Sequence, residues 1–159
     1  MYKRQPDGKP AYVKDVAALA IRSPKRSAGH EFVFELAPPG THTVDRVVLY
    51  NTPSGDEKRY GPMHLFASDF AVYASAESAE PNRFRQIVRA SLEPNTEAQT
   101  FRFEPTQAHY VKLVVLSGHN PKFDRVQLGE FEVYSADGVN VANAYHPDGS
   151  KTAASLLHS

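Results

Sequence analysis

The chain has 159 residues, with 18 Lys and Arg balanced by 18 Asp and Glu, and it contains no Cys. Zero net charge disfavours nucleic acid and anionic membranes as partners, because no field steers a polyanion to the surface. The lack of Cys excludes disulfides, thiol chemistry and thiolate metal sites. No apolar run approaches the roughly 20 residues of a membrane-spanning helix, and the first ten residues contain no apolar signal-peptide core. We expect one globular domain, either cytosolic or excised from a larger protein.

Most of the chain is predicted to form short strands. Residues 13–20 fit either a short helix or a first strand. Beyond them, seven segments alternate apolar and polar residues or are rich in β-branched ones, as strands are. Turn signals with Pro and Gly separate these segments, which are residues 30–36, 43–51, 69–75, 83–92, 99–105, 108–118 and 126–135. Regularly spaced strands without a long helix predict an all-β, antiparallel sandwich or jelly roll.

The alternation also predicts which side chains lie inside. In the strand at 83–92, it places Phe84, Val88 and Leu92 on one face. In the last strand, it places Phe131 and Val133 on one face, and Leu128 with Glu130 on the other. The expected core consists of Phe32, Phe34, Val48, Phe70, Val72, Phe101, Phe103, Val111, Leu113, Val115, Phe131 and Val133.

Four stretches follow one another in a familiar order. They are HEFVFELAPPGTHTVDRVVLYN (30–51), SDFAVYASAESAEPNRFRQIVRASL (68–92), AQTFRFEPTQAHYVKLVVLSG (98–118) and VQLGEFEVYS (126–135). Together they resemble discoidin domains, the coagulation factor 5/8 type C family, and most closely its bacterial carbohydrate-binding-module-like members. The resemblance covers residues 29–135. It implies an eight-stranded, galactose-binding-domain-like jelly-roll sandwich that is not catalytic and that binds sugar, membrane lipid or protein.

The segments outside this domain are expected to be accessory. Residues 1–28 would be partly disordered or form a first strand. The tail, residues 136–159, would be disordered or add a strand. Its VNVANA stretch (139–144) resembles the start of a new discoidin repeat. We therefore favour a module of a larger multidomain protein that is extracellular, periplasmic or on the cell surface.

Family ligands meet loops at one end of the sandwich, and loops on a rigid scaffold often carry function. Two loops, residues 51–69 and 117–125, hold suitable chemistry, and a third at 75–84 adds Asn82 and Arg83. An aromatic ring would stack on the sugar, while planar polar groups would read its hydroxyls. The alternative is that these are ordinary loop residues tucked against the sandwich. The candidate ligand-binding residues are Arg59, Tyr60, His64, Asn120, Phe123 and Arg125.

Glu130 has three readings: a solvated or hydrogen-bonded strand residue, a Ca²⁺ ligand, or a partner contact. In carbohydrate-binding relatives, a Glu in this closing strand helps to hold a structural Ca²⁺, and an Asp-Gly-x-x-x-Thr loop near the N-terminus supplies other oxygens. In the stretch that leads into the first strand, residues 13–31, this pattern is missing and Asp15 is the one Asp. Because Ca²⁺ needs six to eight oxygens, we expect no bound Ca²⁺ and no other cofactor.

Membrane-lipid binding and catalysis are two alternatives to glycan binding. In a lipid-binding loop, three apolar side chains would enter the membrane interface as spikes, unless they cap the core: Met63, Leu65 and Phe66. The basic residues Lys58 and Arg59 precede them. Catalysis is disfavoured because no nucleophile-elbow, zinc-helix or phosphate-loop motif is present. The sequence therefore predicts a non-catalytic module that recognises a carbohydrate. A protein-interaction or scaffold domain is the alternative, and membrane-lipid binding ranks third.

Overall fold

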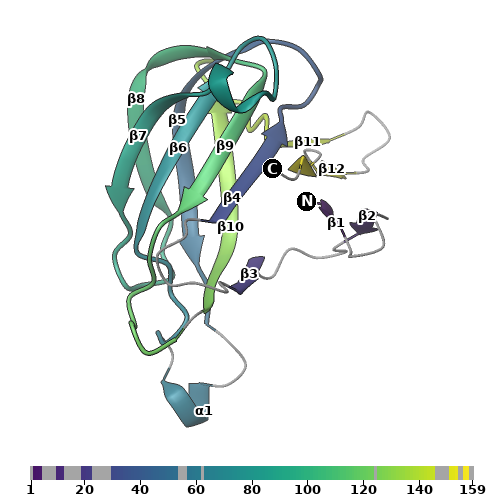
Figure 1. The fold of residues 1–159 in the computed structure, drawn as a ribbon. Coiled ribbons are helices and arrows are strands. Elements are labelled where there is room, and N and C mark those ends of the chain that lie inside the picture. The colour runs from purple at the N-terminus through teal and green to yellow at the C-terminus, as the bar shows by residue number, and fades with distance from the viewer. Residues whose placement is uncertain are drawn as a thin grey trace.

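The computed structural model describes residues 2–4, 10–12, 19–22, 30–53, 57–61, 63–123, 125–145, 151–153 and 156–157 (Figure 1). In these ranges the helices are a single turn, α1 (Glu57–Tyr60), and a 3₁₀ turn, η1 (Pro81–Arg83). No described helix is long or apolar enough to cross a bilayer. The strands are β1 (Tyr2–Arg4), β2 (Pro10–Tyr12), β3 (Leu19–Arg22), β4 (His30–Glu35), β5 (His42–Asn51), β6 (Asp69–Ser75), β7 (Arg85–Ser91), β8 (Gln99–Ala108), β9 (Tyr110–Val115), β10 (Arg125–Ser135), β11 (Asn143–Tyr145), β12 (Lys151–Ala153) and β13 (Leu156–Leu157).

Two antiparallel sheets form the body of the molecule. One has the strand order β3-β10-β5-β8 and the other β13-β4-β9-β6-β7, while β1-β2 and β11-β12 form two separate ribbons. Figure 1 shows the two larger sheets packed face to face. The all-β sandwich predicted from the sequence is therefore confirmed. Two strands from outside residues 29–135 also join these sheets, because β3 pairs with β10 and β13 pairs with β4.

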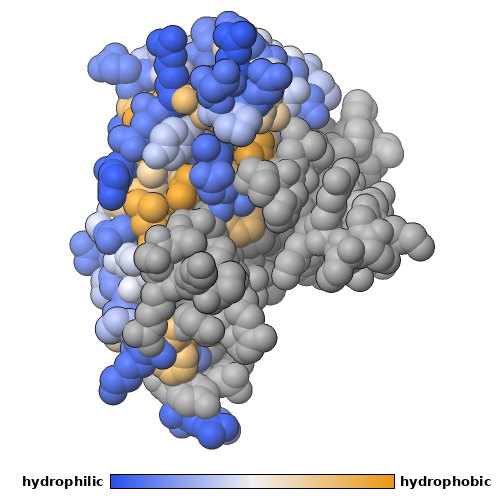
Figure 2. Space-filling view, in the orientation of Figure 1, coloured by the Kyte–Doolittle hydropathy of each residue, from blue (hydrophilic) through white to orange (hydrophobic). Residues whose placement is uncertain are grey.

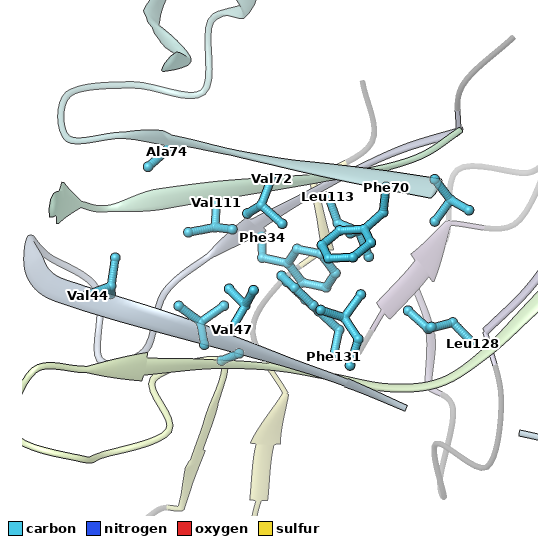
Figure 3. Packing of buried hydrophobic residues seen from close by; sticks show 14 of the residues in the cluster. Phe34, Val44, Val47, Phe70, Val72, Ala74, Val111, Leu113, Leu128 and Phe131 are labelled. Carbon is cyan, nitrogen blue, oxygen red and sulfur yellow. The ribbon is translucent and has the colours of Figure 1, made fainter. Parts of the chain in front are cut away.

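The core fills the space between the two sheets. Phe34 from one sheet meets Phe131 from the other with ring centroids 5.3 Å apart (Figure 3). Phe70 meets Phe101 edge-on, with ring centroids 4.8 Å apart. Of the twelve residues predicted to be inside, Phe32, Phe101 and Phe103 are half-buried against the core and the others are buried. Each fully buried Val, Leu or Phe stabilises the fold by roughly 1.5–3 kcal/mol. Val48 is buried outside the core cluster, since its neighbours Val47 and Leu49 take the inner positions.

A β-bulge at Gly129 changes which face the start of β10 presents. Leu128 pairs with Asn51 and Glu130 with Tyr50, so Gly129 is an extra residue in the ladder. The predicted grouping of Leu128 with Glu130 is therefore wrong, and Leu128 joins the core. Gly is needed here because a Cβ would lie 3.0 Å from Cβ of Thr52. The bulge thus explains the Gly that precedes Glu130.

A second bulge lies in β7. Val88 pairs with Val72 and Gln86 with Tyr73, which leaves Ile87 as the extra residue. The prediction that Phe84 shares the inner face with Val88 and Leu92 is therefore wrong. The Phe84 ring instead lies 5.0 Å from the Lys112 ammonium. The same ammonium lies 4.9 Å from the Tyr73 ring.

The connections gather at the two ends of the sandwich. The lower end, as drawn in Figure 1, carries the connections at residues 52–68, 92–98 and 116–124, with α1 projecting from it. The upper end carries those at 36–41, 76–84, 109 and 136–142. The loop at 75–84 is thus at the opposite end from the other two candidate loops. Asn82 and Arg83 cannot belong to the same site, because β6 carries the chain across the whole sandwich before this loop begins.

Candidate functional site

The two predicted ligand-binding loops lie side by side at the lower end. Ala67 and Gly118 form an isolated antiparallel bridge. The Ser68 amide donates to the Ser117 carbonyl at 2.8 Å, and the His119 amide donates to the Phe66 carbonyl at 2.9 Å. These backbone hydrogen bonds join segments about 50 positions apart in the chain, so the lower end is one connected surface.

Asn51 anchors the first of these loops. Its buried side chain accepts a hydrogen bond from the Ala67 amide at 2.8 Å and donates to the Ala67 carbonyl at 3.1 Å. Its amide nitrogen also lies 3.4 Å from the Glu93 carbonyl, in the connection after β7. A residue at the end of β5 therefore fixes both ends of the loop that begins with it. Sequence reasoning missed Asn51, because its partners become visible only in the folded chain.

Asp69 makes a second junction where three strands end. Ser91 Oγ donates to its Oδ1 at 2.5 Å, and Ser117 Oγ donates to its Oδ2 at 3.0 Å. The bond from Ser91, followed by the one from Ser117, lowers the pKa of the Asp69 carboxyl. Nearby, His119 Nε2 donates to the Leu92 carbonyl at 2.8 Å. The loop at 117–125 is thus fixed to β6 and to the end of β7.

The two loops also share an aromatic contact. The rings of His64 and Phe123 are tilted by 58° with centroids 5.0 Å apart. His64 is only 5% exposed, and its Nδ1 donates to the Gly61 carbonyl at 2.6 Å. Phe123 is half-buried. His64 therefore contacts the Phe123 ring and helps to position it.

Asn120 shapes the turn that presents Phe123. Its Oδ1 accepts a hydrogen bond from the Lys122 amide at 3.0 Å, and its carbonyl accepts one from the Phe123 amide at 3.2 Å. Such a turn, closed by an Asn side chain, is a common local structure. Pro121 and Lys122 are exposed at its tip.

The remaining candidates lie around this centre. Arg59 is exposed on α1 at the lower end. Tyr60 is the last residue of α1 and Arg125 the first of β10, and their side chains are outside the described part of the structure. Of the apolar residues in the same loop, Met63 is exposed while Phe66 is 2% exposed, so Phe66 caps the core.

Glu130 lies elsewhere, on the outer face of β10 beside Glu132. Tyr134 Oη donates to Glu132 Oε2 at 3.1 Å. Burial, together with the neighbouring Glu130 carboxylate, raises the pKa of Glu132. Burial and Glu132 also raise the pKa of the Tyr50 hydroxyl. Glu130 is thus part of a half-buried hydrogen-bonded group on the sheet.

This group does not fit a calcium site. Ca²⁺ needs six to eight oxygen ligands, and across the described residues no three His, Cys, Asp or Glu gather closely enough to hold a metal. Asp15, the other sequence candidate, lies outside the described residues. The oxygens around Glu130 come instead from Glu132 and the hydroxyls of Tyr50 and Tyr134, which are committed to one another.

Figure 2 shows apolar residues toward the middle of the visible face and mostly hydrophilic ones toward its upper end.

Comparison with known proteins identifies the fold of this chain. No protein-family model matches the chain, and no curated protein matches it. Several solved structures are similar to this chain. The family 32 carbohydrate-binding module of AlyQ, solved with 4,5-unsaturated mannuronic acid, has a TM-score of 0.54 and 13% identity over 78% of this chain and 82% of that one. The family 32 module of Clostridium perfringens NanJ, solved with galactose, gives 0.53 and 14% over 76% and 79%.

A third similar structure is a family 32 module from a Clostridium perfringens family 31 glycoside hydrolase. It has a TM-score of 0.56 and 14% identity over 77% of this chain and 80% of that one. The chain therefore has a discoidin-like β-sandwich fold, of the type called galactose-binding-domain-like, as these structures do.

Proposed function

We propose that this chain is a non-catalytic module that recognises a carbohydrate through the loops of its lower end. The observation that carries the proposal is the contact between His64 and Phe123, which joins the two loops around one partly exposed aromatic ring. The fold supports it, because modules of this fold have been solved with galactose and with an unsaturated mannuronic acid.

The arrangement matches what a sugar site requires. In this proposal the half-buried Phe123 ring stacks on the C–H surface of a pyranose, and the contact with His64 and the Asn120 turn hold it in position. Arg59 offers planar guanidinium donors for hydroxyl groups. Tyr60 and Arg125 adjoin these residues in the chain and complete the proposed set. Because both loops are anchored before a ligand arrives, little ordering entropy is lost on binding.

We further infer that the chain works as one module of a larger protein outside the cytoplasm and has no catalytic role of its own. A similar module belongs to a family 31 glycoside hydrolase. In such an assembly the module would hold the parent protein on its glycan, and the chemistry would be done by another domain.

The test is a glycan-array screen with the purified chain, followed by calorimetric titration of the strongest glycan found. Phe123→Ala should weaken that binding by about tenfold or more, because a stacked aromatic ring is lost. Phe84→Ala is the matched control, since it removes another half-buried Phe, far from the lower end, and should leave the affinity unchanged. A chain that binds no glycan would favour a protein-interaction role, and a Phe123→Ala variant that binds as well as wild type would show that the glycan is not recognised by the Phe123 ring.

A further inference from the structure

A cleft of about 450 Å³ opens at the upper end, across the sandwich from the proposed sugar-binding loops. One wall comes from the connection between β4 and β5 and the start of β5, at Pro38 and residues 41–43. The other comes from the turn after β10, at residues 135–139. This volume lies within the roughly 300–1,000 Å³ typical of small-molecule sites.

Backbone hydrogen bonds hold the two walls in place. The Ala136 amide donates to the Thr43 carbonyl at 2.8 Å, and the Ala37 amide donates to the Val141 carbonyl at 2.7 Å, so each wall is tied to the other. Within the turn, the Ser135 amide donates to the Val139 carbonyl at 2.9 Å. The cleft therefore exists before any ligand binds.

The polar groups of the cleft are oriented by their own partners. His42 Nε2 donates to the Pro38 carbonyl at 2.7 Å, so a neutral ring carries its lone pair on Nδ1. Thr43 Oγ1 accepts from Gln107 Nε2 at 2.6 Å, which directs its own proton elsewhere. Ser135 Oγ donates to Asp137 Oδ1, and this bond lowers the pKa of Asp137. The cleft thus presents an acceptor imidazole, a hydroxyl donor and an ionised carboxylate.

Apolar surface completes the cleft. Val139 is 55% exposed at the tip of the turn, so its side chain is not needed for the packing of the core. The ring of Pro38 is exposed on the other wall, while Val141 lies buried between them. Aliphatic surfaces that face each other across hydroxyl, imidazole and carboxylate groups suit a ligand with both C–H faces and hydroxyls.

The charge of the cleft narrows the ligand class. No Lys or Arg is among its lining residues, and Asp137 disfavours an anion. Arg46 lies behind the turn, where it pairs with Asp45 at 2.9 Å and stacks on the Tyr134 ring at 4.7 Å. A purely apolar ligand would leave the hydroxyls and the carboxylate desolvated without partners.

We propose that the upper cleft is a second binding site, which takes a neutral, polyhydroxylated ligand of one or two sugar residues. Asp137 and Nδ1 of His42 accept hydrogen bonds from its hydroxyls, and Pro38 and Val139 cover its C–H faces. The site shares no residue with the lower end and does not depend on it. A module with sites at both ends can hold two glycan chains at once, which raises avidity without any new contact.

The test is an amide chemical-shift titration of the full chain with galactose, N-acetylgalactosamine and mannose at millimolar concentrations. At least one sugar should shift the amides of Thr43, Ala136 and Val139. Asp137→Asn keeps the shape of the turn and should weaken this response about tenfold or more, because a charged acceptor is lost. Phe123→Ala is the control and should leave the upper-end shifts intact.

Three outcomes overturn the proposal. The first is that no sugar moves an upper-end amide, and the second is that Asp137→Asn and Val139→Ala leave the shifts unchanged. The third is that methylammonium, used as a cationic probe, moves these amides while the sugars do not, which would assign the cleft to a cation. Shifts confined to the lower end would sink the second site alone, and shifts confined to the upper end would sink the proposed function alone.

Discussion

The two ends of the sandwich are organised by different means. At the lower end, long loops are held by side chains that reach far along the chain, above all Asn51 and Asp69. At the upper end, the connections at 36–41 and 136–142 are tied to each other by a backbone hydrogen bond, from the Ala37 amide to the Val141 carbonyl. The long connection at 52–68 therefore depends on polar side chains for its position, whereas these two upper connections hold each other through the backbone.

The largest effect is expected from removing the lower-end anchor. Asn51→Ala should lower the free energy of unfolding by roughly 2–4 kcal/mol, because the amide and the carbonyl of buried Ala67 both lose their partner. Urea denaturation measures this loss. Asn82→Ala, an exposed Asn at the upper end, is the matched control and should change stability by less than about 0.5 kcal/mol. Equal effects of the two substitutions would contradict the anchoring role.

A smaller effect is expected at the bulge that leads β10 out of the lower end. Gly129→Ala places a Cβ 3.0 Å from Thr52 Cβ and 3.3 Å from the Tyr50 carbonyl, so a loss of about 1–3 kcal/mol is expected. Thr52→Gly should partly relieve the clash. In a double-mutant cycle the combined loss should be less than the sum of the two single losses. Simple additivity would show that the close approach is not the cause.

A pH-dependent effect on stability is expected from Glu132, which lies on the sheet between the two ends. Burial raises the pKa of Glu132 in the folded state, so the folded chain holds this proton more tightly than the unfolded one. The contribution of Glu132 to stability is therefore present below its unfolded pKa of about 4.3 and is lost as pH rises through the folded pKa. Glu132→Gln should raise the Tm at pH 7 more than at pH 4. An equal shift at both values would contradict the assignment.

The smallest effect is expected from calcium. Because the group around Glu130 does not provide a cation site, we expect the Tm to be the same in Ca²⁺ and in chelator. A site occupied at 100 times its dissociation constant would stabilise the fold by about 2.7 kcal/mol. A clear rise in Tm with Ca²⁺ would therefore show that other oxygens of the chain complete a site.

Much of the sandwich could be predicted because alternation reports burial directly. Phe70 and Val72, for example, are buried as their strand pattern indicates. The bulges at Gly129 and Ile87 were not predicted, since a single extra residue reverses the faces of a strand and leaves no clear mark in the sequence. As a result, Leu128 and Phe84 were each assigned to the wrong face.

The sites were predictable to different degrees. The sequence indicated that the loops holding His64 and Phe123 would be neighbours, and the structure brings these rings together. It gave no sign of Asn51, whose partners Ala67 and Glu93 lie 16 and 42 residues away. The upper cleft was invisible for the same reason, because its walls at His42 and Asp137 are brought together by the pairing of β5 with β10 and by backbone hydrogen bonds between the two connections.

The central claim is that a glycan is recognised at the lower end by the ring of Phe123. The most direct measurement is a calorimetric titration of the strongest array glycan into wild type, Phe123→Ala and Phe84→Ala. We expect Phe123→Ala to lose about tenfold or more in affinity, while Phe84→Ala keeps the wild-type value. Equal affinities for all three proteins would contradict it.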